Sequence, residues 1–290
     1  MTIVVTDNGA GFRQEEIEKL GIKVLPLRFF IDNIEYKETD LSTDDFFDKL
    51  KNAKDIQTSQ PTIAEVEDAF DNLFQKYEHI IYVPMSSGLS GTYSTGVAIS
   101  ENEKYKNKIT VIDAKAISVT QRFVVFDILD MLNKNLTPID IKNKIESNNK
   151  NASIYIMVDT LEYLKKGGRV SPLVATVGSL LHIKPIMYTG GGPFDVSKKE
   201  RTIQNAKNTM LDLICQDMKE KFGSMNSNDY SIGIAYTKNL DEAMDFKQKV
   251  IERFGEFGRE IPVDPLSSFI ACHIGPNSLG VGIYKNIDEY

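Results

Sequence analysis

The chain has 290 residues, of which 41% are hydrophobic and 26% are charged. These proportions are ordinary for a globular protein and exclude a disordered, collagen-like or membrane-embedded chain. The net charge is −7, from 34 Lys and Arg against 41 Asp and Glu, which disfavours a nucleic-acid-binding protein because such proteins need a basic face.

The compartment is predicted from what the sequence lacks. The first residues do not combine a basic segment with an apolar run, as a signal peptide would, and no apolar stretch approaches the ~20 residues of a membrane span. Cys215 and Cys272 are too few for a disulfide framework and lack the paired spacing of a zinc site. We therefore expect a cytoplasmic protein with no integral membrane segment and no metal.

The first half of the chain alternates strand and helix patterns. Apolar runs predict strands, and apolar positions three or four residues apart predict helices. The predicted strands are residues 2–7, 23–31, 79–85 and 108–113, with a hairpin arm at 32–36. The predicted helices are residues 62–77, 91–105, 118–133 and one opening at Thr137. Thr62 and Glu65 form a capping-box pattern at the start of the first of these helices.

A polar segment at residues 147–151 separates this half from a second one that resumes the alternation. Its predicted strands are residues 154–159, 183–189, 230–237, 259–265 and 279–285, and its predicted helices are residues 161–166, 172–181, 201–222 and 241–254. A turn at residues 190–193 leads into a hairpin, which predicts a mixed second sheet. The sequence thus predicts an α/β fold with two domains, residues 1–150 and 151–290.

Ligands of such folds bind at the carboxyl ends of strands, which directs attention to three loops: residues 58–62, 86–92 and 273–276. In the second loop we expect Ser90 to cap a helix and the amide of Gly91 to be free, a pattern that favours an anion. No lysine is present, so a carboxylate or a single phosphate fits better than a nucleotide. A simple cap with nothing bound is the alternative.

Other polar residues would contribute to an anion site only if the fold brings them close to this loop. Thr58 and Ser59 offer further hydroxyl donors, and His273 precedes a Gly-Pro turn, whereas His79 and His182 are interpreted as structural. Arg169 and Arg201 are either solvated or bind a phosphate or a partner's carboxylate. Lys198 and Lys199 make the region of Arg201 locally basic, as a docking surface would be.

A hydrolase is the competing interpretation, with Ser90 as nucleophile and His273 as base. The segment around Ser90 is one residue short of the G-x-S-x-G elbow that presents such a nucleophile.

Six motifs, in this order, resemble the DegV family over nearly the whole chain: TSQPT (58–62), SSGLSGTY (86–93), DTLEYLKKGGRVS (159–171), IKP (183–185), ERT (200–202) and HIGP (273–276). The resemblance implies a two-domain α/β protein, with a parallel sheet in the N-terminal domain and a mixed sheet in the C-terminal domain. It further implies a long-chain, palmitate-like fatty acid in a tunnel between the domains.

Site roles carried over from the family give Thr58, Ser90 and the Gly91 amide as contacts of the fatty acid carboxylate, with His273 beside it. Some members act as the acyl-carrying subunit of a fatty acid kinase, whose separate kinase subunit makes an acyl phosphate, a phospholipid precursor. Arg169 and Arg201 would then serve the headgroup or the docking of the kinase. The resemblance thus implies a monomeric lipid-binding protein without turnover or cofactor of its own.

Two points stay open at this level. The alternative to a lipid carrier is an enzyme using Ser90 and His273, either an acyl hydrolase or a carbonyl-substrate enzyme like the substrate-binding half of dihydroxyacetone kinases. The sequence also departs from the DegV pattern at Asn8, Ala114 and Asn277. We expect these departures to affect acyl preference and kinase partnership more than fatty acid binding.

Overall fold

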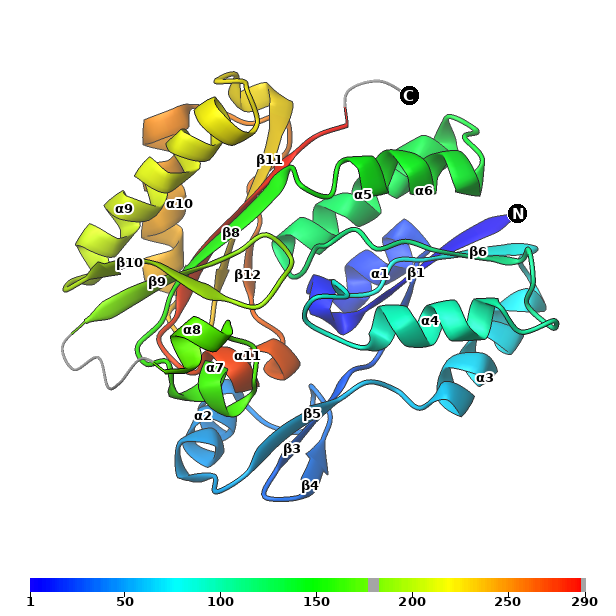
Figure 1. The fold of residues 1–290 in the computed structure, drawn as a ribbon, viewed down its shortest axis with the longest axis horizontal. Helices are drawn as coiled ribbons and strands as arrows, with labels where there is room; N and C mark the ends of the chain where they lie inside the picture. Colours follow the sequence, from blue (N-terminus) through cyan, green and yellow to red (C-terminus); the bar gives the residue numbers. More distant parts are fainter. Residues whose placement is uncertain (177–182, 288–290) are drawn as a thin grey trace.

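The computed structural model describes residues 1–176 and 183–287 and contains three β-sheets (Figure 1). The first is a parallel sheet in the order β2-β1-β6-β7. Its strands are β1 (Thr2–Asp7), β2 (Lys23–Leu25), β6 (His79–Tyr82) and β7 (Ile109–Val111). All four come from the N-terminal half, as predicted.

Helices cover both faces of this parallel sheet, which its apolar strands require. One face packs against α3 (Ile63–Phe74) and α4 (Thr92–Ser100). The other packs against α1 (Gln14–Leu20), α5 (Val119–Asn133) and α6 (Pro138–Ser147). The predicted capping box of α3 is present, with Thr62 as the N-cap and Glu65 returning the bond.

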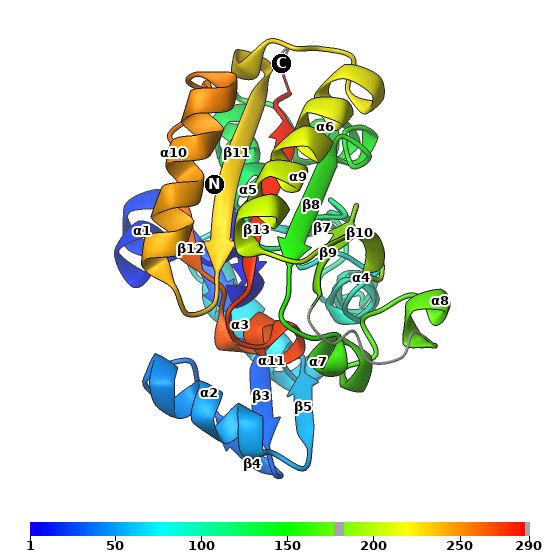
Figure 2. The ribbon, with the colours of Figure 1, turned by 90° about the vertical axis from the view of Figure 1, so that its left-hand side faces the viewer.

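The second sheet has the order β10-β9-β8-β13-β11-β12 and is mixed, as the hairpin predicted. Only the pairing of β11 with β12 is parallel in this sheet. Its strands are β8 (Ala152–Met157), β9 (Lys184–Thr189), β10 (Asp195–Glu200), β11 (Tyr230–Tyr236), β12 (Val263–Pro265) and β13 (Leu279–Lys285). Figure 2 shows α9 (Ile203–Gln216) and α10 (Leu240–Phe254) side by side on its outer face, which they cover. A π-helical turn, Asp217–Lys221, extends α9.

A third, antiparallel sheet was not expected. It consists of β3 (Arg28–Ile31), β4 (Ile34–Tyr36) and β5 (Ile56–Ser59), and it packs with α2 (Thr43–Asn52). The prediction of one strand over residues 23–31 is therefore wrong, because β2 and β3 belong to different sheets. Pro26 lies between them and has no N–H with which to continue a ladder.

Four elements were missed by the sequence patterns: α1, α2, β5 and α11 (Ser268–Ile274). Helix α11 is buried from Phe269 to Ile274, so it shows no alternation of apolar and polar faces from which a helix could be recognised. The predicted strand 259–265 shortens to β12. The predicted helix 172–181 is seen as α8 (Pro172–Ala175) with Thr176 as its C-cap, and residues 177–181, with His182, lie outside the described residues.

Helix α5 joins the two large sheets. Its residues Phe123 and Val124 share one core with Val4 of the parallel sheet and with Ala235 and Tyr284 of the mixed sheet. Helices α7 (Glu162–Lys166) and α11 pack on each other, and α11 also packs on β3 and β5 (Figure 1). The predicted domain boundary at residue 150 falls between α6 and β8 and stays a prediction. None of the helices in residues 1–176 and 183–287 is long and apolar enough to cross a bilayer.

Candidate functional site

The small sheet and α11 bring Thr58 and His273 together. Thr58 lies on β5 and His273 in the last turn of α11, so the prediction that both lie in loops is wrong. The Oγ1 atom of Thr58 is 2.8 Å from Nε2 of His273. This hydrogen bond joins the first and the third of the loops singled out in the sequence.

The imidazole of His273 is neutral over the physiological pH range. The residue is 7% exposed, and burial, followed by the positive charge of Arg169, lowers its pKa to about 3. Its Nδ1 atom is buried and has no hydrogen-bond partner among the described residues. The backbone of Gly167 packs directly against the ring, and a Cβ at that position would overlap Nδ1.

Arg169 provides a cation beside this histidine. Its Nη1 donates to the carbonyl of Gly167 at 2.5 Å, and its Nε donates to the carbonyl of Leu89 at 3.4 Å. The guanidinium is half-buried, and this burial lowers its pKa. Arg169 thereby ties the segment after α7 to the loop that precedes α4.

An apolar cavity opens beside His273 and Arg169. We call it the His273 cavity. A second apolar cavity, floored by Gly280 and Gly282 of β13, is named the Gly282 cavity. Both cavities are lined by Ile117, Phe194, Ile270 and Ile274, so they lie next to each other, and we call the two together the channel. The channel lies between α11, the segment before α5 and the inner face of the mixed sheet.

The loop over residues 86–92 differs in detail from its prediction. The N-cap of α4 is Gly91, not Ser90, and no side chain caps this helix. The Oγ of Ser90 instead accepts hydrogen bonds from the amide of Thr92 at 3.3 Å and its hydroxyl at 3.2 Å. The amides of Leu89 and Ser90 both bond to the Ser86 carbonyl, so a separate turn precedes the helix and places Gly91 at its start.

Gln60 brings the segment after β5 against the start of α4. Its Nε2 donates to Oγ1 of Thr95 at 2.9 Å, and its Oε1 would lie 3.5 Å from a Cβ at Gly91. Gln60 Oε1 is buried and lacks a hydrogen-bond partner in the part of the chain that the structure describes. The segment that follows Thr58 is therefore packed against the start of α4 at Gly91, and the anion site stays a prediction.

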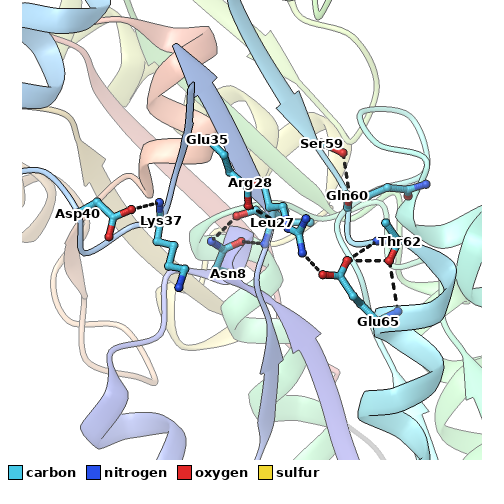
Figure 3. A network of polar contacts seen from close by, with 10 residues as sticks. All are labelled: Asn8, Leu27, Arg28, Glu35, Lys37, Asp40, Ser59, Gln60, Thr62 and Glu65. Atoms are coloured by element: carbon cyan, nitrogen blue, oxygen red, sulfur yellow. Dashed lines mark hydrogen bonds and ion pairs between the residues drawn. The ribbon is translucent and has the colours of Figure 1, made fainter. Parts of the chain in front are cut away.

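A polar network at this same carboxyl end of β5 holds the small sheet against the start of α3 (Figure 3). Arg28 of β3 is paired in register with Ser59 and contacts the carboxylates of Glu35 and Glu65. Glu65 also accepts from the amide of Thr62 at 2.9 Å, which closes the capping box. Asn8 bonds the amide of Leu27 at 3.0 Å and thereby anchors the start of the small sheet to the end of β1.

The other predicted residues lie elsewhere. Arg201 is exposed between β10 and α9. At about 3.3 Å of rise per residue, roughly 20 Å of strand separates it from Phe194 of the channel. His79 bonds Oγ1 of Thr110 at 2.9 Å, in keeping with its structural interpretation. Asn277 bonds Asp159 at 2.8 Å next to the end of α11.

The Ser90–His273 pair that a hydrolase mechanism would need is not formed. Ser90 is bonded by Thr92, and His273 is bonded to Thr58, so the nucleophile and the base of that mechanism are not paired. Across residues 1–176 and 183–287, no three His, Cys, Asp or Glu side chains are grouped so that they could hold a metal ion.

The sequence patterns missed most of the channel wall. Phe194 directly follows the glycine-rich turn, and Leu266, Ile270 and Ile274 recur at four-residue spacing. That spacing was the available signal for α11, and it was hidden because the intervening residues are apolar too.

The fold and the channel define the class: an α/β protein with a parallel and a mixed sheet, in which an apolar channel lies against the mixed sheet and ends at His273 and Arg169. This chain belongs to the DegV family, whose family model, described as one of uncharacterised proteins, matches residues 1–286.

Known proteins resemble this chain over almost its full length. A DegV domain-containing protein of Staphylococcus aureus is 29% identical over 98% of both chains. A fatty-acid-binding DegV family protein of Thermus thermophilus has a similar structure, with a TM-score of 0.87 at 23% identity over 98% of this chain and 99% of that one. A fatty-acid-binding DegV family protein of Streptococcus agalactiae superimposes with a TM-score of 0.84 at 25% identity over 99% of both chains.

Proposed function

We propose that this protein binds one long-chain fatty acid, with its chain in the channel and its carboxylate in the His273 cavity. The observation that carries the proposal is the apolar channel with His273, bonded to Thr58, and Arg169 at one end. The fatty acid binding of the Streptococcus agalactiae relative supports it.

The energetics favour an acyl chain in such a channel. Burying ~14–17 methylenes at about 0.8 kcal/mol each gives on the order of 11–14 kcal/mol before the costs of association. The carboxylate would oppose this gain unless hydrogen-bond donors replaced its water. We assign this role to the hydroxyls of Thr58 and Ser90 and the amide of Gly91.

His273 would act by orienting Thr58. A buried N–H without an acceptor is costlier and rarer than a buried acceptor without a donor. The lone Nδ1 therefore favours the tautomer in which Nε2–H donates to Thr58, leaving the Thr58 O–H free to donate to the carboxylate. Arg169 would add a positive charge that favours the carboxylate and any phosphate built on it.

We further propose that the protein, as a cytoplasmic monomer, presents the bound acid to a separate kinase subunit, which phosphorylates the carboxylate. The protein itself performs no turnover in this proposal. This is supported by the hydrogen bonds of Ser90 and His273, which are made to Thr92 and to Thr58 and not to each other. Arg169 would face the growing phosphate. Arg201, with Lys198 and Lys199, would contact the kinase, because all three side chains are exposed on β10 and just after it.

Native mass spectrometry of protein purified without added lipid tests the binding. We expect a bound mass of a long-chain fatty acid, which delipidation removes and palmitate restores. Absence of such a mass together with failure to load palmitate would overturn the proposal.

The kinase step has its own test. Loaded protein is mixed with ATP and the kinase subunit, and acyl phosphate is trapped with hydroxylamine. We expect Arg201→Glu to lower the yield without changing loading, whereas Arg253→Glu, an exposed site on α10, changes neither. Equal yields from the two variants would remove Arg201 from the docking surface.

A further inference from the structure

We infer that Leu266 sets the upper limit on the length of the acyl chain, because its side chain lines both the channel and a neighbouring open cleft. This inference rests on the proposed function and adds a specificity-determining residue to it.

The cleft lies on the far side of α11 from the channel. It has an empty volume of about 950 Å³ and is bounded by the segment after β1, by α2 and by the connection between β12 and α11. Phe12, Phe46 and Ala271 give it an apolar floor, and Ser42, Ser267 and Ser268 contribute polar groups. Within the described residues, Leu266 is the one side chain that lines both this cleft and the Gly282 cavity.

Helix α11 and the residue before its cap form the wall between the two spaces. Ile270 and Ile274 are four residues apart on α11 and share one side of it, and Leu266, just before the N-cap, lines the channel with them. Ser267, Ser268 and Ala271 line the cleft. Ile270 and Ile274 lie deeper in the wall and are buried, whereas Leu266 is only partly buried. Leu266 is therefore the least buried of the three and the one that lines both spaces.

The other walls of the Gly282 cavity have packed protein behind them. A Cβ at Gly282 would lie 2.6 Å from Cγ2 of Val119, so α5 already touches the sheet there. Val119 and Ala235 belong to the core that α5 shares with both sheets. Shortening these side chains would enlarge a closed space, whereas shortening Leu266 would connect the channel to the cleft. A chain too long for the channel could then continue into the cleft.

The test compares the affinities of palmitate, stearate, arachidate and behenate for delipidated protein. Each further methylene that finds an apolar site tightens binding about fourfold. In the wild type we expect affinity to rise with length and then fall once the channel is full. In Leu266→Ala we expect the ratio of behenate to palmitate affinity to rise at least tenfold. Leu266→Val, a smaller truncation, should shift the ratio in the same direction by a smaller factor. It keeps the test valid if Leu266→Ala fails to fold.

Leu41→Ala is the matched control, because Leu41 lines the cleft and not the channel. It should leave the wild-type profile unchanged. An unchanged profile in both Leu266 variants, or an equal shift in Leu41→Ala, would overturn the inference while wild-type binding still stood. Failure of the wild type to bind any of the four acids would instead overturn the proposed function.

Discussion

Thr58 and His273 are separated by 215 positions in the chain, yet their side chains share a 2.8 Å hydrogen bond. Each residue alone has an ordinary structural explanation, as a strand threonine and as a buried histidine. Their pairing beside Arg169 gives the channel its polar end. The chemistry of the site therefore depends on single atoms that long-range packing brings together.

At the residue scale, Thr58→Val should weaken palmitate binding about 10–100-fold. Valine keeps the shape but removes the proposed donor to the carboxylate and leaves Nε2 of His273 without its partner, at a cost of ~1–3 kcal/mol. Isothermal titration of delipidated protein measures the change. Thr58→Ser restores a hydroxyl and should bind near wild-type strength; equal affinity of Thr58→Val and wild type would remove Thr58 from the site.

The pKa of His273, lowered to about 3, predicts how stability varies with pH. In the unfolded chain the histidine pKa is about 6.5. Below that pH the unfolded chain therefore binds a proton at this residue, whereas the folded protein does not. The contribution of His273 to the free energy of unfolding is therefore complete above about pH 6.5. As the pH falls toward 3, this free energy decreases by on the order of 3–5 kcal/mol. Asp7 acts oppositely, because burial raises its pKa to about 6 and the native state binds the extra proton below that pH.

Urea unfolding at several pH values between 7 and 4, of wild type and of His273→Gln, isolates the histidine from Asp7. We expect the stability advantage of the wild type over the variant to shrink steadily as the pH falls. A constant difference across the range would contradict a buried neutral imidazole.

At the element scale, the capping box of α3 also anchors the small sheet. Glu65 closes the box with Thr62 and contacts Arg28 of β3, which is paired with Ser59 next to Thr58 (Figure 3). The Glu65 carboxylate thus caps the start of α3 and also contacts the strand that is paired with β5.

Glu65→Ala should lower the free energy of unfolding by about 1–2 kcal/mol, because it removes the reciprocal cap bond and the contact with Arg28. Chemical denaturation measures this loss. Asp68→Ala, an exposed acidic site on the same helix, should stay within about 0.5 kcal/mol of wild type. If both variants lose the same stability, the loss reflects helix charge and not the cap.

At the scale of the whole molecule, α5 carries charged groups that face the mixed sheet. Arg122 is 5% exposed; its Nη1 lies 3.6 Å from Oδ2 of Asp264 on β12, and its guanidinium stacks on Phe12. Asp127, fully buried on the same helix, bonds Arg259 at 2.7 Å and Tyr284 at 2.8 Å. These contacts, together with the shared core, hold the two large sheets at the spacing that forms the channel.

Arg122→Met should therefore destabilise the protein by roughly 3 kcal/mol, because the buried carboxylate of Asp264 loses its nearest buried cation. Adding Asp264→Asn should recover part of the loss. Urea unfolding followed by both circular dichroism and tyrosine fluorescence measures these changes. Full additivity of the two substitutions would show that the pair does not couple the sheets.

The sequence alone determined the local elements. Strands such as residues 2–7, the capping box at Thr62 and Glu65, and the hairpin after the glycine turn follow from patterns within a few residues. The ordered motifs around Thr58, Ser90, Arg169 and His273 predicted the family, and the anion site that they imply stays a prediction. These features were accessible because propensity, capping and periodicity act over one or two turns of chain.

Only the tertiary structure decided the rest. It divided residues 23–31 between two sheets at Pro26, made Gly91 the cap of α4, and formed α11, whose apolar residues are buried on both sides. It joined Thr58 to His273 and left Arg201 apart from them. It also placed Leu266 between a channel and a cleft. These outcomes depend on which surfaces, far apart in the sequence, exclude water from each other, and no local pattern records that.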